Sequence, residues 1–144
     1  MKKIQITFIL LGILLLTVLI VACSDDDSNG DDNPDTSSST YSFLVTASSD
    51  SDYTLVGTDA NGEVSGNDPS ITMSIGETIS FSVNAANHPF YIKTVQGGGT
   101  SDQVSGVSNN GATNGVVSWA PAAAGTYYYQ CSDHNGMFGV ITVQ

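Results

Sequence analysis

Residues 125–143 read GTYYYQCSDHNGMFGVITV, and this stretch decides the fold class. Its first half alternates, so Tyr127, Tyr129 and Cys131 share one face of an extended chain. β-Branched and aromatic residues resume at 138–143, after a short polar segment that contains glycine. The pattern predicts two strands joined by a tight loop, with the Cys131 thiol at the end of a buried core.

The side chains of this loop carry metal-binding chemistry. Cys131, His134 and Met137 offer a thiol, an imidazole and a thioether. The chain has two histidines, and the other, His88, stands in the motif NHPFYI, on a predicted strand that aims it inward beside Phe90. A thiolate, two imidazoles and a weak thioether are the donors of a blue-copper site, which suits both Cu(I) and Cu(II). Because the thiol must lose its proton to bind metal, copper affinity should rise with pH.

Each of these residues also has a simpler interpretation. A lone buried cysteine is usually an inert small hydrophobe, and a lone methionine such as Met137 usually packs in a core. The run Tyr127 to Tyr129 would suit a sugar-stacking surface, but alternation places at least two of these rings in ordinary packing. Both histidines and the cysteine and methionine of one loop occur together here. Their combination favours a single copper ion held by His88, Cys131, His134 and Met137.

Short alternating segments separated by turn residues predict the other strands. They lie at residues 41–47, 53–56, 71–75, 78–83, 88–92 and 116–119. With no sustained helical period, about seven or eight short strands predict an all-β, antiparallel Greek-key sandwich over residues 41–144. Met73 and Trp119 are expected in its core. The glycine-rich segment 97–115 is a long loop, either functional or mobile.

The chain resembles the cupredoxin family of type 1 blue-copper proteins over nearly all of the part after Tyr41. SIGETISF at 74–81 resembles the strand before the family's first histidine, and GTYYYQC at 125–131 resembles the strand into the copper cysteine. The short Cys-x2-His-x2-Met spacing is similar to that of amicyanin, whereas plastocyanins have two more residues before the methionine. The resemblance implies three equatorial ligands, one axial ligand and electron transfer through the edge of the second histidine. These ligands would be His88, Cys131 and His134 (equatorial) and Met137 (axial).

Two positions depart from the pattern of the family. Its first histidine is commonly followed by an asparagine whose contacts secure the ligand loops, but Pro89 stands here. Asp133 precedes His134, where proline is frequent. We expect Asp133 to be a solvated turn carboxylate, with a hydrogen bond inside the loop or a contact to a partner as the alternatives.

The amino terminus resembles a bacterial lipoprotein signal. Lys2 and Lys3 precede an apolar run at 4–22, and Cys23 follows it directly. The prediction is a signal peptide at 1–22 and a diacylglycerol on Cys23. The alternative is an uncleaved transmembrane helix, since the run is long enough to span a bilayer.

Residues 23–40 are polar and acidic, and we expect a lipidated cysteine followed by a disordered tether. Ser24 after the lipid cysteine resembles an outer-membrane sorting signal. The acidic run 25–27 resembles the signal that exports some lipoproteins to the cell surface, although a plain acidic linker is the alternative. These features predict an exported outer-membrane lipoprotein, on the periplasmic face or at the cell surface.

The charge limits the partners. The formal net charge is −11, with 14 acids, three lysines and no arginine. Such a chain repels phosphate backbones, which argues against nucleic-acid binding. Removal of the signal peptide would leave Lys93 as the only lysine or arginine. A basic redox protein such as a cytochrome is therefore a plausible partner, although acidity also keeps an exported protein soluble.

Three functions remain open at this point. The first is a lipid-anchored electron carrier with one copper ion, and the second is a copper storage or delivery module with the same ligands. The third is a metal-free sandwich that serves as a surface interaction module. The sequence has no Ser-His-Asp arrangement, phosphate loop or paired carboxylates set for hydrolysis, so we do not expect an enzyme.

Overall fold

The computed structural model describes residues 40–144. The predicted signal peptide, the lipidation of Cys23 and nearly all of the predicted tether lie outside the described residues. Within the part that is described, no helix has the length and apolar character needed to cross a membrane.

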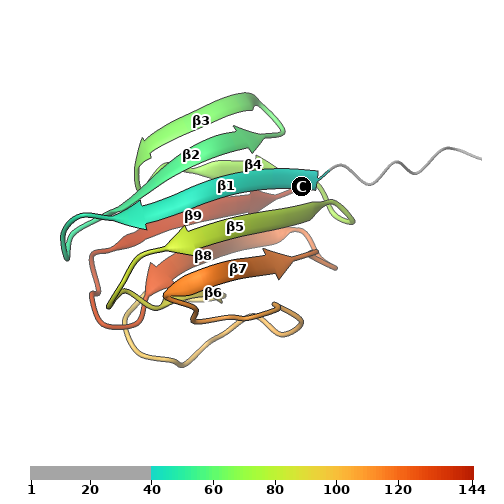
Figure 1. The fold of residues 1–144 in the computed structure, drawn as a ribbon. Coiled ribbons are helices and arrows are strands. Elements are labelled where there is room, and N and C mark those ends of the chain that lie inside the picture. Colours follow the sequence, from blue (N-terminus) through green and yellow to red (C-terminus); the bar gives the residue numbers. More distant parts are fainter. Residues whose placement is uncertain (1–39) are drawn as a thin grey trace, which may run out of the picture. The chain divides into compact units, whose positions relative to one another are not determined.

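Within residues 40–144, nine strands form two sheets that pack face to face (Figure 1). One sheet has five strands in the order β3-β2-β1-β5-β7, and the other has four in the order β4-β9-β8-β6. The strands are β1 (Thr40–Ala47), β2 (Tyr53–Asp59), β3 (Gly62–Asn67), β4 (Ile71–Met73), β5 (Thr78–Asn84), β6 (Phe90–Lys93), β7 (Asn114–Trp119), β8 (Gly125–Cys131) and β9 (Phe138–Val143). The predicted all-β sandwich is confirmed.

The sheets are not purely antiparallel, which refines the prediction. β1 pairs with β5 in parallel, and β4 pairs with β9 in parallel. Alternation along one strand defines its two faces but says nothing about its neighbour, so these pairings could not be predicted. Strand β3 was not predicted because it is an exposed edge strand, with only Val64 partly buried.

The core lies between the sheets and is built from the inward positions of the alternating strands. Four rings are fully buried, and Phe90 and Tyr129 contact each other and both of the other two, Tyr53 and Phe81. Phe90 stacks on Tyr129 with 5.5 Å between ring centroids. Met73 and Trp119 are also buried, as predicted. This aromatic cluster lies directly behind the end of the sandwich where β6 and β8 pair Phe90 with Cys131.

The long segment after β6 pairs with the free edge of that strand. Val104 N–H donates to Ile92 O, and Gly111 N–H donates to Phe90 O. The Asn110 carboxamide both accepts from Ile92 N–H and donates to Ile92 O. The loop therefore supplies backbone partners for an edge strand that would otherwise be open.

Candidate metal centre

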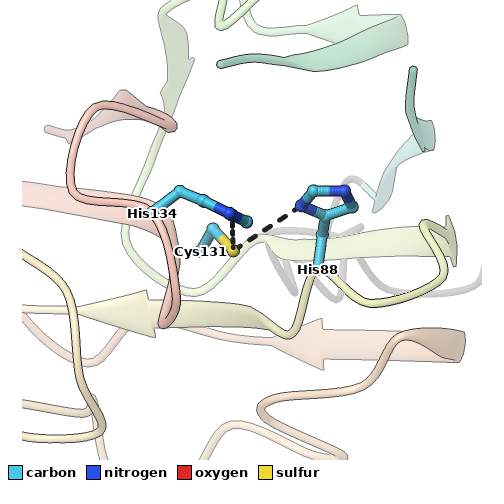
Figure 2. A group of neighbouring side chains, drawn as sticks. All are labelled: His88, Cys131 and His134. Carbon is cyan, nitrogen blue, oxygen red and sulfur yellow. Dashed lines mark hydrogen bonds between the residues drawn. The ribbon is translucent and has the colours of Figure 1, made fainter. Parts of the chain in front are cut away.

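Three of the four predicted ligands meet at one end of the sandwich (Figure 2). The Sγ of Cys131 lies 3.4 Å from Nδ1 of His134 and 4.0 Å from Nδ1 of His88. The two imidazole rings are 5.0 Å apart between centroids. Residues that are 43 positions apart in the sequence thus present one sulfur and two ring nitrogens to a common point.

The three side chains differ in exposure. Cys131 is completely buried, and the side chain of His88 is 10% exposed. The side chain of His134 is 29% exposed, so it is the most accessible of the three. The sulfur is therefore sheltered from water, whereas one imidazole reaches the surface.

The loop between β8 and β9, residues 132–137, is held closed by its own backbone; we call it the ligand loop. Cys131 N–H donates to Met137 O at 3.0 Å, and Met137 N–H donates to His134 O at 3.2 Å. These bonds fold the chain back on itself within six residues. The thiol and the imidazole are brought together by this tight turn and not by the strand itself.

His88 lies in a turn before β6, so the prediction of a strand through His88 was wrong. His88 N–H donates to Ala85 O, and Asn87 has a φ of 66°, a left-handed conformation that asparagine tolerates. Pro89 has no N–H to donate to a strand ladder, and β6 begins only at Phe90. The inward direction predicted for His88 is nonetheless correct, since it is buried.

Two hydrogen bonds tie this turn to the rest of the site. Ser132 N–H donates to Pro89 O at 3.3 Å, which joins the ligand loop to the His88 turn. The Tyr53 hydroxyl donates to His88 O at 3.0 Å. Burial, and secondarily the nearby Cys131, raise the pKa of Tyr53 far above its ordinary value, so the phenol keeps its donor proton. Tyr53 was predicted only as a strand residue, and its sequence gave no sign of this contact.

A carboxylate from the five-stranded sheet faces both histidines. Asp50, in the turn between β1 and β2, has one oxygen 3.8 Å from His88 Nε2 and the other 3.7 Å from His134 Nε2. Both Nε2 atoms therefore face Asp50, and both Nδ1 atoms face the sulfur. A carboxylate beside the outer nitrogen favours the tautomer that leaves the inner nitrogen free for a metal. In the sequence, Asp50 appeared only as part of a polar turn.

The two remaining loop residues of interest are Met137 and Asp133. Met137 is completely buried at the end of the ligand loop, six positions after Cys131. Asp133 is exposed, and it accepts a hydrogen bond from the Ser132 hydroxyl at 2.7 Å. The carboxylate of Asp133 thus has the solvated position expected for it, with a hydrogen bond inside the loop.

The donor set is consistent with one type 1 copper ion. Protein nitrogen and sulfur donors bind such metals at roughly 2.0–2.3 Å, so two of them on one ion lie at most about 4.5 Å apart. The two sulfur-to-nitrogen distances, 3.4 and 4.0 Å, satisfy this limit. One buried thiol and two imidazoles through Nδ1, with the buried Met137 thioether in the same loop, are the ligand types that copper accepts in both oxidation states.

Several solved structures are similar to this chain. A copper protein, rusticyanin, is 21% identical with a TM-score of 0.49, and the match covers 73% of this chain and 78% of that chain. Rusticyanin from Thiobacillus ferrooxidans in another structure is 20% identical with a TM-score of 0.46, covering 73% and 77%. The periplasmic domain of cytochrome oxidase subunit II of Bradyrhizobium japonicum is 16% identical with a TM-score of 0.41, covering 73% and 83%. No protein-family model and no curated protein matches the sequence.

Proposed function

We propose that the chain is a mononuclear type 1 copper protein of the cupredoxin family that carries single electrons between redox partners. One observation carries the proposal: the buried Cys131 sulfur faces Nδ1 of both histidines of the chain, at distances that one ion can span. The ligands would be His88, Cys131 and His134, with Met137 as the axial donor. Bound copper would supply a one-electron couple.

The arrangement of the ligands supports a carrier. The sulfur and both ring nitrogens converge on a common point, and the turns that hold them are fixed by backbone hydrogen bonds. Ligands held in this way need little rearrangement between the two oxidation states, which favours fast transfer. His134 is the ligand that reaches the surface, and its exposed edge offers the electron a short path to a partner.

The charge supports a basic redox partner such as a cytochrome. Between residues 40 and 144 the only lysine or arginine is Lys93, and this side chain is buried. Asp50 and Asp133 are exposed close to the ligands. A partner with a positive surface around its own redox centre would be attracted to this end of the molecule.

The proposed location is the outer membrane, through a lipid on Cys23, with the domain on the periplasmic face or at the cell surface. This part of the proposal is supported by the amino-terminal sequence alone: a basic start, an apolar run that ends at Cys23 and an acidic segment after it. Mass spectrometry of the protein from its native membrane tests it. Cleavage before Cys23 with an added diacylglycerol is expected, and an intact apolar run would favour a membrane helix instead.

The copper site is tested by an absorption spectrum of the full chain in detergent, titrated with Cu(II). An intense visible charge-transfer band should appear and saturate at one equivalent, because thiolate ligation of Cu(II) produces it. Cys131→Ser should abolish the band, whereas Cys23→Ser, a change of the other cysteine, should keep it. A colourless wild-type protein with reduced Cys131 would overturn the proposal and leave the metal-free interaction module.

Copper storage or delivery is the second candidate, since it uses the same ligands and a partly exposed His134. The two roles differ in what leaves the protein. A carrier exchanges electrons rapidly with a soluble cytochrome and retains its copper. A delivery module passes the ion to a Cu(I) chelator or acceptor protein and exchanges electrons poorly.

A further inference from the structure

Gln130 has a burial that its strand position does not explain. Its neighbours Tyr129 and Cys131 point into the sandwich, so Gln130 should face outward, opposite Tyr91 of β6. It is nevertheless completely buried. A polar side chain is buried in this way only when its hydrogen-bonding groups are satisfied, so its partners identify its role.

The partners of the Gln130 carboxamide are the ligand residues themselves. Its Nε2 lies 2.9 Å from Cys131 O, 2.9 Å from His134 O and 3.1 Å from Met137 O. The two amide hydrogens are therefore shared among three carbonyls, each belonging to a proposed ligand. Two of these carbonyls also accept backbone hydrogen bonds: Met137 O accepts from Cys131 N–H, and His134 O accepts from Met137 N–H. The carboxamide thus adds hydrogen bonds to a loop that its own backbone already closes.

A short glycine segment covers Gln130 from outside. We call residues 97–99 the glycine arch. Gly97 N–H donates to Gln130 Oε1 at 3.1 Å, so all the hydrogen-bonding atoms of the carboxamide have partners. The ammonium of Lys93 binds the carbonyls of all three glycines of the arch, and this lysine is 1% exposed. The only lysine of the described part therefore fixes the cover of the metal end.

The arch is also bonded directly to the ligand loop. Gly98 N–H donates to Asn135 Oδ1 at 2.7 Å, and Gly99 N–H donates to Ser132 O at 2.6 Å. The approach is so close that a Cβ on Gly98 would overlap Asn135 Oδ1. Gln130, Lys93 and the arch form one connected network around the outer side of the ligand loop.

We propose that Gln130 is a positioning residue of the metal centre, which holds the carbonyls of Cys131, His134 and Met137 so that the ligand side chains converge on one point. The inference rests on the proposed function and deepens it. The glycine arch and Lys93 act through Gln130 and Asn135. A purely structural glutamine would contribute to stability alone, whereas a positioning residue also determines the geometry at the sulfur.

The first test compares Gln130→Met with Gln103→Met in the full chain. Gln130→Met keeps the length of the side chain and removes its hydrogen bonds. Gln103, an exposed glutamine that donates to Thr100 O and accepts from Asn110 Nδ2, is the control. In the metal-free protein, hydrogen–deuterium exchange of the Met137 amide should rise about tenfold in Gln130→Met and stay unchanged in the control. After Cu(II) is added, the charge-transfer band should shift and copper affinity should fall about 10- to 100-fold.

A second pair of variants keeps the proposal testable if Gln130→Met does not fold. Gly98→Ala lies outside the ligand loop and forces the arch away from Asn135. Ser105→Ala, an exposed change on the same long segment and outside the ligand loop, is the control. We expect Gly98→Ala to shift the copper band and to increase exchange in residues 132–137, whereas Ser105→Ala should match the wild type in both measurements.

The outcomes separate this inference from the proposed function. A wild-type chain that shows no thiolate–copper band overturns the proposed function, and the exchange measurement still decides whether Gln130 holds the loop. A normal band and normal exchange in Gln130→Met overturn the role of Gln130, and the same result in Gly98→Ala overturns the role of the glycine arch. A Gln130→Met variant that loses stability but keeps the spectrum and copper affinity of the wild type also overturns the role of Gln130.

Discussion

The outer faces of the two sheets contrast sharply. On the five-stranded sheet, Leu44, Val56 and Val116 are each more than half exposed, although they are apolar. On the four-stranded sheet, the outward positions Lys93 and Gln130 are buried, although they are polar. Each face therefore shows the reverse of the exposure that its residue types alone would predict.

The cause of the contrast is the glycine arch. Residues 97–99 cover the outer face of β6 and β8 and supply three carbonyls and an N–H group to the side chains beneath them. The five-stranded sheet has exposed Leu44 and Val116 at the corresponding outward positions. Lys93 and Gln130 are thus buried beside the ligand loop, and hydrogen bonds to the glycine arch and to the loop satisfy them there.

The largest change in stability is expected when Lys93 is replaced. Lys93→Met keeps most of the side-chain volume but leaves the carbonyls of the arch without the ammonium, so the free energy of unfolding should fall by about 2 kcal/mol. Leu44→Thr, on the open face of the other sheet, should change it by less than about 0.5 kcal/mol. Urea denaturation of the metal-free protein measures both. Equal stability of the two variants would mean that the arch does not depend on Lys93.

The same contrast shows what could be predicted from the sequence. The alternation into Cys131 and the short spacing to His134 predicted the strands and the tight loop, whereas the convergence with His88 was inferred from the combination of donor types. Strand period and loop length are local signals, since they depend on neighbouring residues. The inward direction of His88 was predicted correctly, although the residue lies in a turn and not in a strand.

The residues that support the ligands could not be predicted. Gln130 occupies an outward position of its predicted strand, and Lys93 comes just after the predicted strand 88–92. The segment that covers both side chains, residues 97–99, lies in a separate loop that neither strand pattern indicates. Asp50 and Tyr53 reach the site from the other sheet, and Tyr53 precedes His88 by 35 residues. Such contacts depend on how the two sheets pack, and no short pattern in the sequence encodes that packing.

A prediction of intermediate size concerns Asp68, in the connection from the five-stranded to the four-stranded sheet. Burial raises the pKa of its carboxyl to about 6, although a hydrogen bond from Tyr53 N–H lowers it, and nearby Asp52 adds to the rise. The folded state therefore binds the proton more tightly than the unfolded chain does. The contribution of the protonated Asp68 carboxyl to folding stability is present below about pH 4 and is lost as the pH rises to about 6.

Asp68→Asn should remove this loss. Asparagine accepts the same Tyr53 N–H and tolerates the left-handed backbone at this position, where φ is 44°. Relative to the wild type, the variant should gain on the order of 1 kcal/mol between pH 4 and pH 7, less than the full shift implies because the group is partly exposed to solvent. Denaturation curves at both pH values check this. If the stability difference between Asp68→Asn and the wild type is the same at pH 4 and pH 7, the carboxyl of Asp68 has an ordinary pKa.

The smallest effect is expected where the five-stranded sheet approaches the metal site. Asp50 is the carboxylate that this sheet presents to His88 and His134, at 3.8 and 3.7 Å, and its side chain is 79% exposed. Solvent screens such contacts, so Asp50→Asn should weaken copper binding by no more than about fivefold. Asp102→Asn, an exposed change on the long loop, should have no effect.

Competition with a Cu(I) chelator measures both affinities, and high salt provides a second readout. Because the Asp50 contact is exposed, the difference between wild type and Asp50→Asn should shrink as ionic strength rises, whereas the effect of Gln130→Met should persist. An Asp50→Asn effect as large as that of Gln130→Met, and equally insensitive to salt, would contradict this ranking. The site would then depend on the turn between β1 and β2 as much as on the network beneath the glycine arch.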